Sequence, residues 1–442
     1  TFPAFQRATL DNGLKLIVVE RPELPVVGLS LILDAGYAAD QSAQPGTASL
    51  TMAMLDEGTK TRNALEISEQ LALLGASIGA GSSLDTSSIG LSALADKLEP
   101  SLEIFADVLL NPVFPQKELD RLRKEYLAAL SQEKTQPNSM ALRVVPKLLY
   151  GEGHAYAQPL TGTGTEATLA ALTREDLARF HDQWFRPNHA TLIAVGPVTV
   201  GSLKPQLERL LGNWQPGDIP AKQVASVAPR ASRTLYLLDK PGADQSVIFA
   251  GQLIPPRATP DQAAIELMND VLGGQFTSRL NMNLREDKHW SYGARSFAYD
   301  ARGQRPFLAY APVQTDKTAE AIAEIRREFA ELVGKRPATP EEVAMVKRTN
   351  TLSLPGQWET GGAVLGSVSQ IVQFGLPDDY WNNYAATIRG VTPEQVNKAA
   401  KDHLRPEDLV MVVVGDRQVI EPKLKGLGFD SIQLINADGE LL

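Results

Sequence analysis

The fold is decided by a stretch that occurs twice. Residues 172–196 read LTREDLARFHDQWFRPNHATLIAVG, and residues 391–415 read VTPEQVNKAAKDHLRPEDLVMVVVG, with corresponding positions 219 residues apart. In both copies a Thr precedes the first turn of a predicted helix and an acid lies within that turn. An Arg-Pro pair ends the helix, because proline pushes the preceding residue out of the α region. The apolar run that follows is typical of a buried strand.

A second pair of segments repeats with nearly the same spacing. An alternating strand at residues 88–95 meets Asp-Lys and then a helix at 98–109, and a strand at 307–315 meets Asp-Lys and then a helix at 318–332. The offset is 220 residues here. Two matches with almost equal offsets indicate that the chain is a duplication.

We therefore predict two homologous halves, at residues 1–214 and 234–442. They are joined by a linker at residues 215–233, which is rich in Pro, Ala and Ser and lacks apolar periodicity. Each half mixes strands in hairpin-like order with pairs of longer helices. This pattern predicts an α+β fold in which each half is a mostly antiparallel sheet with helices packed on one face.

Composition excludes several classes of function. The net charge of −9 argues against a nucleic-acid partner, which clustered Lys and Arg would bind. The absence of cysteine excludes disulfides, thiolate zinc sites and cysteine nucleophiles. No apolar run is long enough to span a membrane. The first residue is Thr1, which fits either a removed signal peptide or a trimmed sequence. We expect a periplasmic protein, with the cytoplasm as the alternative.

The segment that should carry chemistry lies at residues 46–59, GTASLTMAMLDEGT. It resembles the signature helix of the insulinase, pitrilysin and mitochondrial processing peptidase family of zinc peptidases. Active members carry the inverzincin motif His-x-x-Glu-His there, in which the two His bind zinc and the Glu activates the zinc-bound water. This chain has Ser49, Met52 and Ala53 at those three positions. Read without the resemblance, the segment is an ordinary core helix with small residues on one face.

The remaining ligand candidates do not complete a zinc site. The resemblance places the family's third ligand, a Glu, near Ala128 or Ala129, and a shifted register would give Glu125 or Glu133. A lone carboxylate does not hold zinc. No two of the five histidines are four residues apart on one helix, although distant segments can in principle assemble a site. We expect this chain to bind no metal. The histidines are His154, His181, His189, His289 and His403.

The resemblance covers nearly the whole chain. Residues 10–18 resemble the family's first hairpin, with an Asn-Gly turn. Residues 150–163 resemble its midsection, and residues 186–196 resemble the close of its first half.

A pair of residues in the second half matches the family's active members. Arg285, at the end of a predicted helix, and Tyr292, at the start of a predicted strand, are seven residues apart, as are the Arg and Tyr of active members. The resemblance implies that the Arg binds substrate through paired hydrogen bonds and that the Tyr donates to the oxyanion of the tetrahedral intermediate. The alternative is structural, with Arg285 solvated near Glu286 and Tyr292 packed on a sheet. The preceding Gly273-Gly274 is not a phosphate loop and predicts a tight turn near a partner or peptide.

Three functions follow from these residues. The first is a split peptidase, in which this chain supplies Arg285 and Tyr292 and a homologous zinc-binding subunit supplies the metal, so that the chain alone is inactive. The second is a purely structural subunit, like the core proteins of a respiratory complex that share this fold. The third is a peptide-binding protein without catalysis. The first would form a heterodimer in which four similar domains enclose a chamber for peptide substrate.

Overall fold

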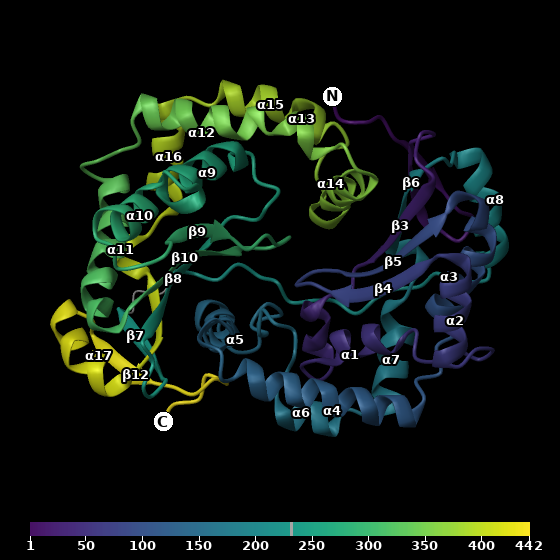
Figure 1. Ribbon diagram of the computed structural model, residues 1–442, viewed down its shortest axis with the longest axis horizontal. Coiled ribbons are helices and arrows are strands. Elements are labelled where there is room, and N and C mark those ends of the chain that lie inside the picture. Colours follow the sequence, from purple (N-terminus) through teal and green to yellow (C-terminus); the bar gives the residue numbers. More distant parts are fainter. Residues whose placement is uncertain (230–232) are drawn as a thin grey trace. The chain divides into compact units, whose positions relative to one another are not determined.

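The computed structural model describes residues 1–229 and 233–442, which form two compact units (Figure 1). Each unit contains one six-stranded sheet. The first unit contains Thr1–Leu130, Gly162–Gln223 and Pro355–Asn382, and the second contains Ser131–Thr161, Val224–Leu354 and Asn383–Leu442.

The sheet of the first unit has the strand order β1-β2-β6-β3-β5-β4. Only β2 and β6 pair in parallel, so the sheet is mostly antiparallel. The predicted first hairpin is present, because β1 pairs with β2 across a turn in which Gly13 has a φ of +90°. The strands are β1 (Gln6–Thr9), β2 (Lys15–Glu20), β3 (Val26–Leu33), β4 (Ser77–Ser82), β5 (Ser87–Leu94) and β6 (Ala190–Gly196).

The sheet of the second unit has the order β12-β7-β11-β8-β10-β9. Its registers repeat those of the first sheet. Leu31 pairs with Leu192 between β3 and β6, and the residues 219 positions later, Ala250 and Met411, pair between β8 and β11. The predicted duplication is therefore confirmed at the level of residue pairing. The strands are β7 (Thr234–Asp239), β8 (Gln245–Ile254), β9 (Arg295–Ala298), β10 (Arg305–Gln314), β11 (Val410–Gly415) and β12 (Ser431–Leu434).

The helices also repeat. Thr173 and Thr392 cap α7 and α16 as predicted, each accepting a hydrogen bond from the third backbone N–H of its helix. The helices of the first unit are α1 (Thr47–Met54), α2 (Ala64–Leu74), α3 (Leu98–Leu110), α4 (Gln116–Glu133, whose last turn counts with the second unit), α6 (Glu166–Ala171), α7 (Arg174–Trp184), α8 (Val200–Leu211) and α14 (Gly361–Phe374). Those of the second are α5 (Pro137–Tyr150), α9 (Gln262–Asn269), α10 (Arg279–Asn281), α11 (Thr318–Val333), α12 (Pro340–Leu352), α16 (Pro393–His403) and α17 (Arg417–Leu424). The helices α13 (Leu354–Gln357) and α15 (Tyr380–Gly390) cross the unit boundaries.

Short non-α turns connect these elements. The π-helical segments η4 (Asp270–Gly274) and η5 (Met282–Asp287) lie in the second unit. The 3₁₀ turns are η1 (Tyr37–Ser42), η2 (Ala95–Lys97), η3 (Pro187–His189), η6 (Thr315–Lys317), η7 (Pro406–Asp408) and η8 (Lys425–Leu427).

Helices cover both faces of the first sheet. One face packs against α1, α3, α7 and α8 in the main core of the unit. On the other face, Val364 and Val368 of α14 pack on Ile32 and Ile193. This α14 belongs to the second half of the sequence, and α5 of the first half packs on β8 and β11 of the second unit in the same way. The α+β class is confirmed, and each sheet carries a helix on its second face as well as on the predicted one.

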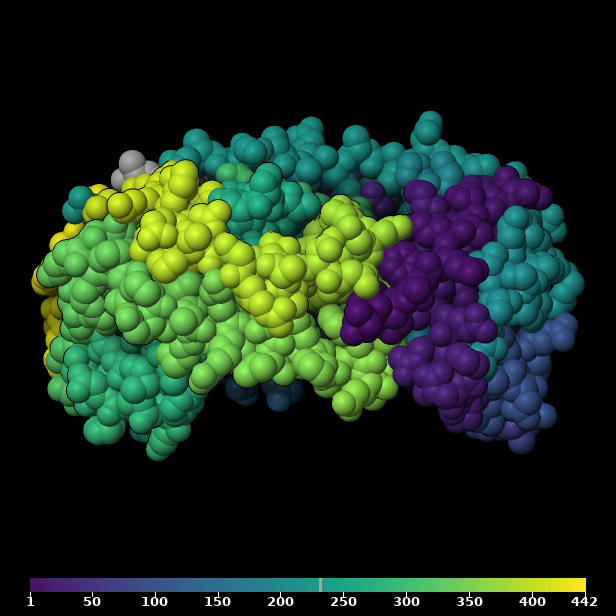
Figure 2. Space-filling model, turned by 90° about the horizontal axis from the view of Figure 1, so that it is seen from above, coloured from purple at the N-terminus to yellow at the C-terminus, as the bar shows by residue number. Residues whose placement is uncertain are grey.

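The exchange of segments also makes the compact units differ from the sequence halves 1–214 and 234–442. Residues 355–382 belong to the first unit, where Arg7 forms an ion pair with Asp378 (2.6 Å). In Figure 2 the purple N-terminal residues lie against yellow-green residues from this part of the chain. The described part of the predicted linker, residues 215–229 and Arg233, contains no helix or strand, whereas residues 230–232 lie outside the described residues. No helix among the described residues is both long and apolar enough to cross a membrane.

Candidate active site

The helix α1, which contains the predicted degenerate zinc-site positions, begins at Thr47 and follows the N-cap residue Gly46, which has a φ of +94°. Its N-terminus is held by Asp40, whose carboxylate accepts hydrogen bonds from the backbone N–H groups of Gly46 and Ala48 at 2.8 Å each. Asp40 is 2% exposed, and this burial raises the pKa of its carboxyl group to about 7. This cap was not predicted from the sequence, because Asp40 lies before the helix in a separate turn.

The three positions of the zinc motif have different environments on α1. Met52 is fully buried in the hydrophobic core of the first unit. Ser49 and Ala53 are half-buried, and their spacing of four residues places them on one face of the helix. A thioether, a methyl group and one neutral hydroxyl do not make the nitrogen and oxygen donor set of a zinc site, so these residues do not fit the metal.

The candidates for the third ligand are either apolar or already engaged. Ala128 and Ala129 are exposed on α4. Glu125 accepts a hydrogen bond from Arg121 (3.0 Å), and Glu133 pairs with Arg143 (3.4 Å). Within residues 1–229 and 233–442, no group of three His, Cys, Asp or Glu side chains could hold a metal ion.

Arg285 lies in the π-helical segment η5 of the second unit. Its guanidinium carbon is 4.8 Å from the centre of the Phe276 ring, and its Nε is 3.4 Å from the Glu286 carboxylate. About two fifths of the Arg285 side chain is exposed to solvent. An aromatic face and a weak ion pair therefore orient a guanidinium that remains accessible.

Tyr292 lies in the loop between η5 and β9, three residues before the strand begins, and not at the strand start as predicted. Its side chain is 86% exposed, so it does not pack on a sheet. The backbone around it is held in place: Trp290 donates to the Leu284 carbonyl at 2.9 Å, and Ala294 donates to the Asn281 side chain at 3.2 Å. The phenol is thus presented to solvent from an ordered loop.

A strained residue connects Arg285 to this loop. His289 has a φ of +57°, which is rare for a residue with a side chain. Its backbone N–H and its ring Nδ1 both contact the carbonyl oxygen of Arg285, at 3.2 and 3.0 Å. These two contacts hold the turn between Arg285 and Tyr292 in one conformation. Strained backbone of this kind and π-helical segments are both common at functional sites.

The Gly273-Gly274 pair has a different role from the predicted turn. Neither glycine has a positive φ. A Cβ on Gly273 would lie 2.3 Å from the backbone nitrogen of Ser296, so this glycine allows η4 to lie directly on β9. The glycines serve packing inside the second unit.

The structure also reveals a buried pair of carboxyl groups that was not predicted from the sequence. Asp270 of η4 and Glu266 of α9 lie one helical turn apart, and the Asn350 amide donates to them at 2.7 and 3.4 Å. Burial, together with the neighbouring charge of Glu266, raises the pKa of Asp270 to about 7. Tyr384 donates to Glu266. The spacing of these two acids, one helical turn apart, was the sequence signal that could have predicted the pair.

Comparison with known proteins places this geometry in a family. The model of the insulinase family, peptidase family M16, matches residues 15–164, and the model described as the peptidase M16 inactive domain matches residues 171–350. An uncharacterised zinc protease of Streptomyces coelicolor is 23% identical over 93% of this chain and 90% of its own length. A non-peptidase homologue of Helicobacter pylori is 22% identical over 92% of this chain and 93% of its own.

Solved structures agree with this assignment. The crystal structure of a peptidase M16 inactive domain from Pseudomonas fluorescens has a TM-score of 0.87 and is 28% identical, covering 93% of this chain and 98% of that one. A protease from Helicobacter pylori shares the fold, with a TM-score of 0.84 and 19% identity over 94% of this chain and all of that chain. The chain belongs to the insulinase family, peptidase family M16.

Proposed function

We propose that this chain is the zinc-free subunit of a heterodimeric metallopeptidase that cleaves peptides. A homologous chain with an intact His-x-x-Glu-His helix carries the zinc site, and this chain supplies Arg285 and Tyr292. Alone, the chain is inactive. The periplasmic location remains a prediction, which cell fractionation tests.

The observation that carries the proposal is the exposure of Tyr292. A tyrosine that is 86% exposed contributes little to the stability of its own unit. The loop backbone around it is nevertheless fixed by hydrogen bonds from Trp290 and Ala294. Stabilisation of an oxyanion requires a hydroxyl donor that is positioned before the reaction, and the fixed backbone of this loop limits the positions that the exposed phenol can reach.

The environment of Arg285 supports a substrate-binding role. Its contact with Glu286 is long, at 3.4 Å, and both side chains are about two fifths exposed. Such a pair contributes little to stability, so a peptide carbonyl or carboxylate can replace Glu286 at small cost. The Phe276 ring keeps the guanidinium oriented during this exchange.

The first unit supports the assignment of zinc to a partner. Its helix α1 retains the position of the family's zinc helix but offers Ser49, Met52 and Ala53 in place of the ligands and base. The second of these is part of the hydrophobic core. The helix is therefore kept for packing.

The test is steady-state kinetics on this chain mixed with a family member that carries the intact motif. Tyr292→Phe removes only the hydroxyl and is expected to lower kcat about 10²-fold, as for other oxyanion donors. Arg285→Gln is expected to raise KM as well, because it removes a group that holds substrate in the ground state and the transition state. Tyr236→Phe on β7 and Arg348→Gln on α12 are matched controls and should leave both constants unchanged.

Assembly is measured separately by sedimentation, where all variants should form one-to-one complexes. Wild-type kinetics from Tyr292→Phe and Arg285→Gln would contradict the proposal. That result would favour a structural or peptide-binding subunit, a role in keeping with the Helicobacter pylori relative that is named a non-peptidase homologue.

A further inference from the structure

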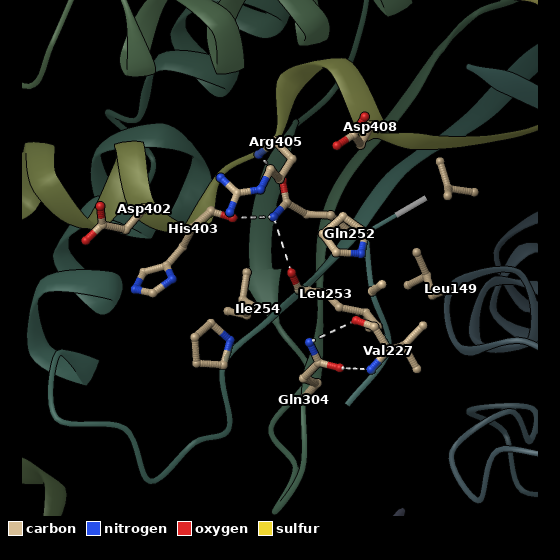
Figure 3. A pocket seen from close by; sticks show the side chains of 14 residues that line it. Leu149, Val227, Gln252, Leu253, Ile254, Gln304, Asp402, His403, Arg405 and Asp408 are labelled. Carbon is tan, nitrogen blue, oxygen red and sulfur yellow. Dashed lines mark hydrogen bonds between the residues drawn. The ribbon is translucent and has the colours of Figure 1, made fainter. Parts of the chain in front are cut away.

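A pocket of about 220 Å³ lies in the second unit (Figure 3). Neither Arg285 nor Tyr292 lines it. It is bounded by the end of β8, by the turn that follows α16 and by residues 227–229. Leu149, Val227, Ile254 and Val410 supply apolar walls. The volume is below the range of about 300–1,000 Å³ that is usual for drug-sized ligands, so the pocket suits a ligand the size of one amino acid.

Two glutamine side chains fix the backbone segments that form the walls of the pocket. Gln252 donates to the His403 carbonyl (2.6 Å) and accepts from the backbone N–H of Arg405 (2.7 Å). Gln304 accepts from the N–H of Val227 (2.6 Å) and donates to its carbonyl (3.3 Å). Figure 3 shows both contacts at the walls of the pocket. Because these amides are engaged with backbone, they are not the groups that would recognise a ligand.

The duplicated fold offers an internal comparison. The counterparts of Leu253, His403 and Arg405, located 219 residues earlier, are Asp34, Trp184 and Arg186 in the first unit. In the first unit a lysine side chain of the protein occupies the equivalent site. The Lys222 ammonium forms an ion pair with the Asp34 carboxylate and lies 5.7 Å from the centre of the Trp184 ring.

The arginine of the first copy is covered as well. A Cβ on Gly217 would lie 3.2 Å from Nε of Arg186, so the backbone at Gly217 packs closely on this guanidinium. In the second copy Arg405 is exposed and lines the pocket. Leu253 has replaced the acid that binds Lys222, and His403 is engaged by Asp261. The site in the second unit therefore lacks the carboxylate that would bind an inserted lysine. The Arg405 guanidinium is accessible there instead.

Among the described residues, two opposite charges at the pocket lack a side-chain partner. Within the described residues, neither the Arg405 guanidinium nor the Asp408 carboxylate makes a side-chain hydrogen bond or ion pair, whereas Asp402 pairs with Lys398. An accessible cation, an accessible anion and an apolar cavity complement a ligand that carries a carboxylate, an ammonium group and an aliphatic side chain. We propose that this pocket binds an aliphatic α-amino acid, with its carboxylate on Arg405 and its ammonium on Asp408.

The test uses the purified chain and three probes: leucine, N-acetylleucine, which lacks the ammonium group, and leucinamide, which lacks the carboxylate. Calorimetric titration should show the tightest binding for leucine. Because both recognition groups are partly solvated, each missing charge should weaken binding by about fivefold. Equal affinity for all three probes, or binding of none at millimolar concentration, would overturn the proposal.

Two variants assign the charges. Arg405→Gln should remove the preference for leucine over leucinamide, and Asp408→Asn should remove the preference over N-acetylleucine. Neither side chain has a partner to lose within the described residues, so both variants should fold, which circular dichroism checks. Arg348→Gln on α12 is the matched control and should keep both preferences. A variant that weakens all three probes equally would point to a structural role and contradict the assignment.

Discussion

The two units share one fold but differ in which of their side chains are buried and which are exposed. In the second unit the counterparts of Ser49, Met52 and Ala53, located 219 residues later, are Met268, Val271 and Leu272, and all three are buried in the core. In the first unit only Met52 is buried, whereas Ser49 and Ala53 remain small and half-exposed. The first copy thus has a partly exposed face with small side chains on α1, at the positions where active members of the family are expected to carry their zinc ligands.

For exposed polar side chains, the second unit is the more open of the two. The second unit presents Tyr292 from a hydrogen-bonded loop and leaves Arg405 accessible at a pocket. The first unit covers the counterpart of that arginine and fills the equivalent site with Lys222. Duplication therefore fixed the sheets and the helix positions, and the exposed side chains diverged. The comparison predicts that changes in α1 act on stability.

The largest effect on stability should come from Met52. Met52→Ala removes a fully buried side chain from the core and should cost about 2–5 kcal/mol of unfolding free energy, because the cavity that remains cannot fully collapse. Met52→Leu conserves volume and should cost less than about 1.5 kcal/mol. Ser49→Ala on the half-exposed face should change stability by less than about 0.5 kcal/mol. Urea unfolding followed by circular dichroism measures all three. A small effect of Met52→Ala would mean that α1 is loosely packed.

Local sequence patterns predicted the elements that depend on near neighbours. The caps Thr173 and Thr392, the strand that ends at Gly196 and the turn at Gly13 are where they were predicted, because each depends on a few adjacent residues. The equal spacing of the two copies predicted two homologous halves, and the structure shows that the paired strands of both sheets share one register.

Features that depend on distant residues were not predictable in this way. The packing of α14 on the first sheet and of α5 on the second depends on which sheet each helix meets, and helical periodicity does not encode that choice. The π-helical segments η4, which contains Gly273-Gly274, and η5 carry no sequence signal that distinguishes their wider turn from an α-helical one, and Gly273 allows η4 to lie directly on β9. Tyr292 was predicted at a strand start, but β9 begins three residues later.

The residues at the positions of the zinc motif, in contrast, could be assessed from the sequence alone. The residue types at Ser49, Met52 and Ala53 alone sufficed to predict that the ligands are absent, since chemistry and not packing decides whether a metal can bind. No sequence signal distinguished the buried Met52 from its half-exposed neighbours.

A second comparison concerns the buried acids Asp40 and Asp270, one in each unit. Burial raises the pKa of each carboxyl group from 3.8 to about 7. Between about pH 4 and 7 the folded chain therefore holds protons that the unfolded chain releases. Stability should fall as pH rises through this window and then level off, by on the order of 4 kcal/mol for each group. Unfolding free energies measured from pH 4 to 8 give the slope.

Single variants separate the two acids. Asp40→Asn and Asp270→Asn should each flatten part of the slope, and the double variant should flatten most of it. Asp239→Asn, at the exposed end of β7, should leave the slope unchanged. A slope in this window that neither Asp40→Asn nor Asp270→Asn changes would show that the two carboxyl groups ionise as they do in the unfolded chain, which would contradict the prediction.

The smallest effect should come from the side chain that fills the first unit's site. Lys222→Met removes the ammonium group that pairs with Asp34, but the Asp34 carboxylate is about a quarter exposed and can be hydrated. The expected cost is about 1 kcal/mol, between that of a surface ion pair and that of a buried hydrogen bond to a charge. Asp34→Leu places the second unit's residue in the first, and the double variant Lys222→Met with Asp34→Leu closes a thermodynamic cycle. Urea unfolding should give a coupling energy of about 1 kcal/mol between the two residues. Since the double variant also has the apolar character of the second unit's pocket, it should be more stable than the sum of the single variants predicts. A coupling energy of zero would mean that Lys222 merely covers the site, and the two copies would then differ in shape alone.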